Sequence, residues 1–199
     1  PMIQWVAELS LKVVGQENVY IATDNKKILN TVNKAGFKGI LTSKNCLTGT
    51  DRLAEVAKKV KADIYVNVQG DEPLVKPIDI KKIINLKKKF PNDIVNGFTP
   101  INKNEDPKNI NIPKVIFTKD KKLVYMSRNA IPGFKEKKNE PAVYFKQVCI
   151  YAFNREELLL FSSRKNKSKL ELSEDIEILR FLEMGKTIRL IQTSSGSLA

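Results

Sequence analysis

The chain has 199 residues, 42% of them hydrophobic and 29% charged, which fits one soluble globular domain with a sizeable core. It contains no histidine, and this excludes His-based catalytic triads, imidazole acid–base catalysis and the usual zinc sites. The formal net charge of +13 would attract a polyanion such as a nucleoside triphosphate. Because 29 of the 35 basic residues are lysine, we interpret most of the excess as solvated surface and expect no nucleic-acid partner.

The two cysteines, Cys46 and Cys149, lie far apart and near apolar runs. We interpret them as reduced, partly buried thiols of a cytoplasmic protein, with a disulfide as the alternative. No apolar run reaches membrane-spanning length and no signal peptide is recognisable, so we expect no membrane partner. The sequence contains neither a G-x-G-x-x-G nor a Walker phosphate loop.

Helical and strand patterns alternate through the first half of the chain. The expected helices span residues 2–14, about 25–35, about 48–60 and 78–90, and the expected strands span 19–23, 39–41 and 64–68. Asp24 or Asn25 can cap the second helix, and Thr48 or Thr50 can cap the third. This order predicts a mostly parallel sheet covered by helices.

The second half is richer in strand patterns. The expected strands span residues 94–101, 114–118, 123–127, 148–153 and 188–191, with a hairpin turn at 119–122 and a polar loop at 133–140. Two helices are expected, at residues 155–161 and 174–184, the second capped by Ser173 and closed by Gly185. We predict an α/β fold with one domain over residues 1–199.

Residues 66–73, Val-Asn-Val-Gln-Gly-Asp-Glu-Pro, form the most informative segment. An apolar strand runs into Gln69, Gly70, Asp71 and Glu72. In open α/β sheets ligands bind beyond the carboxyl ends of the strands, and Mg²⁺ takes one or two carboxylates together with substrate oxygens. One of these two adjacent carboxylates is therefore a candidate Mg²⁺ ligand, and an acidic turn with no further role is the alternative.

Several segments in chain order resemble one family. They are Thr-Gly-Thr-Asp-Arg-Leu-Ala-Glu-Val at 48–56, Val-Asn-Val-Gln-Gly-Asp-Glu-Pro at 66–73, Ile-Ala-Thr-Asp at 21–24, Pro-Lys-Val at 113–115, Tyr-Met-Ser-Arg at 125–128 with Ile-Pro at 131–132, and Ile-Tyr at 150–151. They resemble the 3-deoxy-manno-octulosonate cytidylyltransferases, or CMP-Kdo synthetases, over essentially the whole chain. The resemblance implies a three-layer α/β/α nucleotide-diphospho-sugar transferase (Rossmann-like) fold. It also implies a β-rich dimerisation extension at about residues 100–150 and a homodimer.

This family transfers CMP from CTP to the anomeric hydroxyl of Kdo, an acid sugar, and releases pyrophosphate for lipopolysaccharide or capsule synthesis. The resemblance implies that the chain is a nucleotidyltransferase that uses Mg²⁺. It assigns Asp71 to catalysis and to the metal, and Thr50, Arg52 and Gln69 to CTP. For Arg52 the alternative is an ion pair with Glu55 on a solvated helix face.

The family pattern also implies that both ends of the chain are truncated. Residues 1–3 resemble the end of a Gly-Lys-Pro-Met-Ile stretch, and residues 196–199 resemble the start of a Gly-Ser-Leu-Ala-Val-Asp-Thr-Pro stretch. A basic phosphate-binding loop would precede residue 1, and a second metal-binding aspartate would follow residue 199. We therefore expect the 199-residue chain to lack part of its active site.

On the sugar side the resemblance implies that Arg128 is a catalytic residue and a clamp for the sugar carboxylate, and that Tyr151 and Glu177 contact the sugar. Gln147 stands where the family usually has His, and Ile178 where it usually has Gln. These departures leave the sugar open. The alternatives are a sialic-type acid and an amino-substituted Kdo, whose ammonium would suit the acidic residues Glu174, Asp175 and Glu177, of which Glu174 and Glu177 would share a helix face. A non-catalytic nucleotide- or RNA-binding module is a further alternative.

Overall fold

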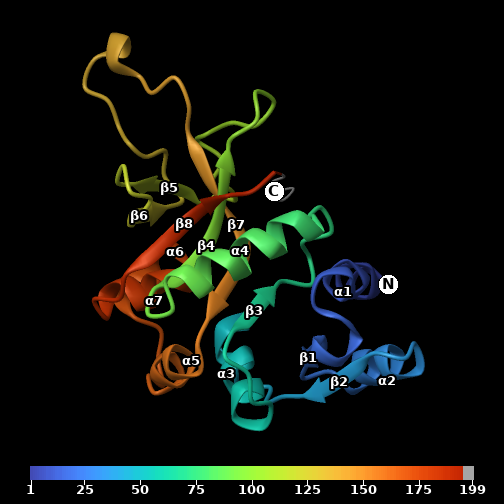
Figure 1. The fold of residues 1–199 in the computed structure, drawn as a ribbon. Coiled ribbons are helices and arrows are strands. Elements are labelled where there is room, and N and C mark those ends of the chain that lie inside the picture. The colour runs from blue at the N-terminus through green and yellow to red at the C-terminus, as the bar shows by residue number, and fades with distance from the viewer. Residues whose placement is uncertain (195–199) are drawn as a thin grey trace.

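A computed structural model describes residues 1–194, in which helices cover a mixed β-sheet (Figure 1). The helices are α1 (Met2–Val14), α2 (Lys26–Lys34), α3 (Gly49–Lys59), α4 (Pro77–Lys89), α5 (Arg155–Ser162), α6 (Lys169–Glu174) and α7 (Ile178–Glu183), with short 3₁₀ helices η1 (Gln16–Asn18) and η2 (Lys137–Asn139). The strands are β1 (Tyr20–Thr23), β2 (Lys38–Leu41), β3 (Tyr65–Val68), β4 (Ile94–Pro100), β5 (Lys114–Phe117), β6 (Leu123–Ser127), β7 (Phe145–Phe153) and β8 (Ile188–Gln192).

The larger sheet has six strands. Five follow one another in the order β6-β5-β7-β4-β8, and the sixth, β3, pairs with residues 150–153 of β7. β7 runs antiparallel to both β3 and β4, while β4 and β8 are parallel. β1 and β2 form a separate parallel pair. The prediction of a mostly parallel sheet is therefore wrong for the larger sheet, because β7 enters it between β3 and β4 from the opposite direction.

Helices cover both faces of the larger sheet. Successive residues of β7 point to opposite faces, so Tyr151 and Phe153 join one core cluster and Ile150 and Ala152 join another. The first cluster contains side chains of α3, α5 and α7, and the second contains side chains of α4. This arrangement gives the three-layer α/β/α fold that was predicted (Figure 1).

Polar side chains fix the starts of α2 and α3 as predicted. The Asn25 carboxamide oxygen accepts hydrogen bonds from the backbone N–H groups of Lys27 at 2.8 Å and Ile28 at 3.3 Å. The Thr48 hydroxyl accepts one from the N–H of Asp51 at 3.2 Å and so begins α3. These caps place the first turn of α3 at a defined point beside β3.

The helix predicted over residues 174–184 is wrong. The chain forms two short helices there, because Asp175 adopts a left-handed conformation with φ 50° and ends α6. Ser168, rather than Ser173, opens α6. Glu174 and Glu177 therefore do not share one helix face, and their carboxylates contact different elements.

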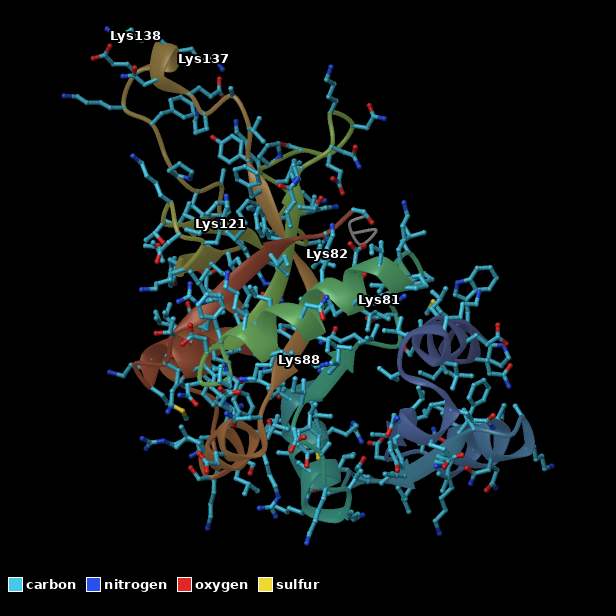
Figure 2. The ribbon with its side chains drawn as sticks, in the orientation of Figure 1. Lys81, Lys82, Lys88, Lys121, Lys137 and Lys138 are labelled. Carbon is cyan, nitrogen blue, oxygen red and sulfur yellow. The ribbon has the colours of Figure 1, made fainter. Side chains whose placement is uncertain are left out.

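The β5–β6 hairpin and the loop that carries η2 form an extension that projects from the sheet (Figure 1). Within residues 1–194, no helix is both long enough and apolar enough to span a membrane. Figure 2 shows the labelled lysines on separate surfaces, with Lys81, Lys82 and Lys88 along α4, Lys121 in the hairpin, and Lys137 and Lys138 at the tip of the extension. Residues 196–199, where a family stretch was expected to start, lie outside the described residues.

Candidate active site

A cavity of about 490 Å³ lies where β3 ends beside β7, the start of α3 and the segment between α6 and α7. Six of the eight predicted site residues line it, and these are Gln69, Asp71, Arg128, Gln147, Tyr151 and Glu177. Gln69 directly follows the last residue of β3 and Asp71 comes two residues later, as expected for ligand-binding residues of an α/β sheet. The two remaining predicted residues, Thr50 and Arg52, are not among the lining residues.

Glu177 connects the cavity to the start of α3. Its carboxylate accepts a hydrogen bond from the backbone N–H of Thr50 at 2.9 Å and another from the side-chain amide of Gln69 at 3.2 Å. Burial raises the pKa of Glu177, and the hydrogen bond from Thr50 partly offsets that rise. Glu177 thus holds two of the predicted CTP-contacting segments together.

Arg52 lies on the outer side of the same turn. Its guanidinium donates to the Thr42 hydroxyl at 2.5 Å and lies 3.7 Å from the carboxylate of Asp24. Glu55 instead accepts from the backbone N–H of Ser43 at 2.8 Å, so the alternative of an Arg52–Glu55 pair is wrong. The ion pair between Arg52 and Asp24 thus joins the family segments at 21–24 and 48–56.

Three backbone carbonyls hold the Arg128 guanidinium at the cavity. Its Nη1 donates to Ile110 at 2.9 Å, its Nη2 donates to Asp175 at 3.0 Å, and its Nε donates to Glu174. The Asp175 carboxylate lies 3.9 Å from Nη2 and pairs with Lys167 at 2.6 Å. A hydrogen bond from Lys167 lowers the pKa of Asp175. Arg128 is therefore an oriented cation at the cavity wall, in keeping with the predicted carboxylate clamp.

Gln147 and Tyr151 belong to a buried polar network on one face of the sheet. The Gln147 amide donates to Asn96 and to the Tyr151 hydroxyl, both at 3.2 Å. Asn96 in turn donates to the backbone carbonyls of Val148 at 2.9 Å and Ile150 at 3.0 Å. Burial raises the pKa of Tyr151 well above its usual value, so its hydroxyl stays neutral.

Sequence reasoning missed several residues of the cavity wall. Lys146 lines the cavity, is only 3% exposed and pairs with Glu105. Its cross-strand neighbour Lys114 is fully buried and donates to the Asn109 carbonyl at 2.9 Å. Burial and the nearby Arg128 charge lower the pKa of Lys114. Nothing in a chain with this many lysines marks these two as interior.

Cys149 also lines the cavity and is a free thiol. Burial raises its pKa, and the nearby Glu72 carboxylate adds to the rise. Cys46 is likewise unpaired, so the prediction of two reduced cysteines is confirmed for the structure. A buried thiol with a raised pKa is a poor nucleophile, and Cys149 therefore acts as part of the wall.

Asp71 is the carboxylate best placed to hold a divalent cation. It lines the cavity and is exposed, whereas Glu72 is 4% exposed and accepts a hydrogen bond from the Cys149 N–H at 3.3 Å. Residues 1–194 contain no cluster of three or more His, Cys, Asp or Glu side chains suited to a metal. One carboxylate completed by substrate oxygens and water fits Mg²⁺, which rarely needs a full protein cage.

A family model described as Cytidylyltransferase matches residues 1–188. The chain belongs to this cytidylyltransferase family. The curated 3-deoxy-manno-octulosonate cytidylyltransferase of Geotalea daltonii is 36% identical over 100% of the chain and 82% of the relative. That of Escherichia coli is 35% identical over 98% of the chain and 78% of the relative. The predicted family resemblance is confirmed.

Two further comparisons bear on the fold and the sugar. A solved structure of CMP:2-keto-3-deoxy-manno-octonic acid synthetase complexed with CTP matches with a TM-score of 0.88 and 35% identity, over 98% of this chain and 81% of that one. This match confirms the predicted nucleotidyltransferase fold. An 8-amino-3,8-dideoxy-manno-octulosonate cytidylyltransferase of Shewanella sp. is 34% identical over 100% of the chain and 82% of the relative.

Proposed function

We propose that the chain transfers CMP from CTP to the anomeric hydroxyl of Kdo or a Kdo-like acid sugar and releases pyrophosphate. The observation that carries the proposal is that one cavity holds Gln69 and Asp71 on one side and Arg128 and Tyr151 on the other. These are the residues that the family resemblance assigned to CTP and to the sugar. Relatives named for this reaction match nearly the whole chain.

The cavity offers the groups that such a reaction needs. Backbone carbonyls occupy three of the five N–H groups of the Arg128 guanidinium, so two N–H groups, one on each Nη, remain to donate to a sugar carboxylate. The Gln69 amide offers a donor and an acceptor for a cytosine edge or a ribose. Transfer of a nucleotidyl group depends mainly on positioning and on neutralising phosphate charge. In this proposal the role of the cavity residues is to hold the two substrates so that the hydroxyl faces the α-phosphorus.

We also propose that Mg²⁺ takes part, with Asp71 as its protein ligand. When bound, a divalent cation neutralises phosphate oxygens and polarises the reacting phosphorus. Support comes from the exposed Asp71 carboxylate on the cavity wall, just beyond the end of β3. Removal of divalent cations with a chelator should abolish pyrophosphate release, and retained turnover would contradict this assignment.

Two acid sugars, Kdo and an amino-substituted Kdo, are the main candidates for the substrate. Gln147 and Ile178 depart from the family pattern, and the Shewanella relative is named for an amino-substituted sugar. However, Glu174 and Glu177 do not converge on one point, since Glu174 accepts from Ser127 at 2.8 Å and Glu177 accepts from the N–H of Thr50. Glu174 also does not line the cavity, so the two carboxylates cannot together bind one ammonium, and we place Kdo first and an amino-substituted Kdo second.

The test of function is a pyrophosphate-release assay of the full-length protein with CTP, Mg²⁺ and a panel of acid sugars. Turnover with Kdo and with 8-amino-Kdo, compared by kcat/KM, separates the two candidates, and a sialic acid tests the third. Salt-sensitive RNA binding without turnover of any sugar would instead favour the non-catalytic alternative.

Finally, we propose that the protein is a cytoplasmic homodimer whose interface includes the extension. Support comes from apolar side chains exposed there, with Val143 50%, Val124 49% and Phe134 42% exposed. Unpaired cysteines agree with a reducing compartment. Phe134→Glu should shift a dimer toward monomer in light scattering, whereas an unchanged mass would place the interface elsewhere.

A further inference from the structure

Arg180 is the largest fully buried side chain among the described residues, and it holds two carboxylates at once. Its Nε and Nη2 each donate to the Glu171 carboxylate at 2.6 Å. Its Nη1 and Nη2 donate to the Asp51 carboxylate at 3.1 and 3.4 Å. Nη1 also donates to the Phe161 carbonyl at 3.4 Å, and the guanidinium carbon lies 3.7 Å from the Phe161 ring centre. All five N–H groups of the guanidinium thus have acceptors.

Stability alone gives little reason for such a cluster. Removing a guanidinium and two carboxylates from water carries a desolvation cost that their pairing only offsets, and apolar side chains of similar volume often serve as well. The cluster instead fixes the position and orientation of the two carboxylates, because both bind the same planar guanidinium. The role of Arg180 therefore depends on which parts of the fold carry Asp51 and Glu171.

Asp51 is part of the first turn of α3 and contacts Thr48, the residue that caps this helix. Its carboxylate accepts from the Thr48 hydroxyl at 2.9 Å, and its N–H donates back to that hydroxyl at 3.2 Å. Thr48 lines the cavity. Glu171, in contrast, lies on α6, where it closes a capping box with Ser168 away from the cavity. One carboxylate of the cluster thus reaches the cavity wall and the other does not.

The same turn of α3 is held at a second point by the same part of the chain. Glu177 accepts from the N–H of Thr50, and Arg180 binds the neighbouring Asp51. Glu177 and Arg180 are three residues apart and linked by a backbone hydrogen bond of 3.2 Å. Two anchors on successive residues fix both the place and the rotation of the turn that carries Thr48, Thr50 and Arg52.

We propose that Arg180 is a positioning residue for the nucleotide side of the cavity and acts through Asp51. This inference rests on the proposed function and on the family resemblance, which assigns Thr50 and Arg52 in this turn to CTP. Arg180 touches neither substrate. It holds the first turn of α3 at the distance from Gln69 at which both can meet one nucleotide, and a shift of the order of 1 Å in such a turn can cost up to about a hundredfold in rate.

Two isosteric variants separate this role from a purely structural one. Asp51→Asn and Glu171→Gln each remove one negative charge from Arg180 with little change in shape, and only the first acts on the cavity. The measurements are the urea midpoint, the Kd for CTP with Mg²⁺ by calorimetry, and the separate KM values for CTP and the sugar. We expect both variants to lose stability, Asp51→Asn to bind CTP about tenfold more weakly, equivalent to about 1.4 kcal/mol, and Glu171→Gln to bind it within about twofold of wild type.

A third variant tests whether Asp51 acts through Arg180. Arg180→Lys keeps the charge but loses the bidentate fork, and it should weaken CTP binding as Asp51→Asn does. The double variant that combines Asp51→Asn with Arg180→Lys should then bind CTP no more weakly than the worse of these two single variants, because both changes interrupt the same contact. If the lysine variant does not fold, the Asp51 and Glu171 comparison still decides.

The outcomes are distinguishable. Wild-type CTP affinity in Asp51→Asn, or equal weakening in Glu171→Gln, would overturn the positioning role while leaving the proposed function intact. Additive effects in the double variant would show that Asp51 acts without Arg180. Wild-type protein that binds no CTP would instead refute the proposed function, and this inference with it.

Discussion

The stability of a Glu177→Gln variant, measured relative to wild type at the same pH, should increase as the pH rises. Burial raises the pKa of this carboxyl above 4.5. The native state therefore binds the proton more tightly than the unfolded chain between pH 4.5 and the native pKa. Across that window wild type loses stability with rising pH and Glu177→Gln does not. Each unit by which the native pKa exceeds the unfolded pKa adds about 1.4 kcal/mol to the change, across this window, in the unfolding free energy of Glu177→Gln relative to wild type.

A second substitution measures the contacts rather than the charge. Glu177→Ala removes the acceptor for the Thr50 N–H and for the Gln69 amide, at 2.9 and 3.2 Å. Leaving a buried donor without a partner costs roughly 1–3 kcal/mol, so the alanine variant should be less stable than the glutamine variant by about that amount. Gln keeps one carbonyl oxygen, which can still accept from Thr50.

Urea unfolding of wild type and both variants, from about pH 5 to about pH 8, provides the measurement. The free-energy difference between wild type and Glu177→Gln should grow in favour of the variant as the pH rises, and then level off. A difference that stays constant over this range, or grows in favour of wild type, would refute the reasoning. Equal stability of the Gln and Ala variants would show that the Thr50 contact contributes nothing.

Three further substitutions or modifications have definite expected outcomes. Asp71→Asn should keep the melting temperature and lose most of kcat with Mg²⁺, and near-normal turnover would make Asp71 a turn residue only. Glu157→Gln should lower the urea-unfolding free energy by about 3–5 kcal/mol, because the buried Lys87 ammonium loses its carboxylate at 2.7 Å; a loss under about 1 kcal/mol would contradict a buried ion pair. Burial and Glu55 raise the pKa of Cys46 to about 11, so its alkylation rate should still rise steeply above about pH 9. A rate that levels off near pH 8 would be inconsistent with that environment.

The sequence predicts the local elements well because their signals are local. The caps at Asn25 and Thr48 and the hairpin at 119–122 each depend on a few neighbouring residues, and all three are present. The break at Asp175 escapes this reasoning, because its apolar neighbours Ile176 and Ile178 fit a continuous helix equally well. Asp tolerates the left-handed conformation, and only tertiary contacts decide that it adopts it.

Strand order and burial of charge depend on contacts that a single sequence does not display. The pattern of β7 shows a buried strand, yet nothing in it says that the strand enters between β3 and β4. The rule that ligands bind at strand ends does locate Gln69 and Asp71, since that rule depends only on where a strand stops. Lys114 and Lys146 are interior only because the strands that carry them pair with each other.

The segment from α6 to α7 joins the two sides of the cavity. Glu174 accepts from the backbone N–H of Arg128 at 2.8 Å and so fixes the end of β6, on the side assigned to the sugar. Three residues later Glu177 holds the first turn of α3, on the side assigned to CTP. The left-handed turn at Asp175 lets two nearby carboxylates face different elements, which one continuous helix would not allow. The break that the sequence did not predict therefore lets one short segment contact both halves of the site.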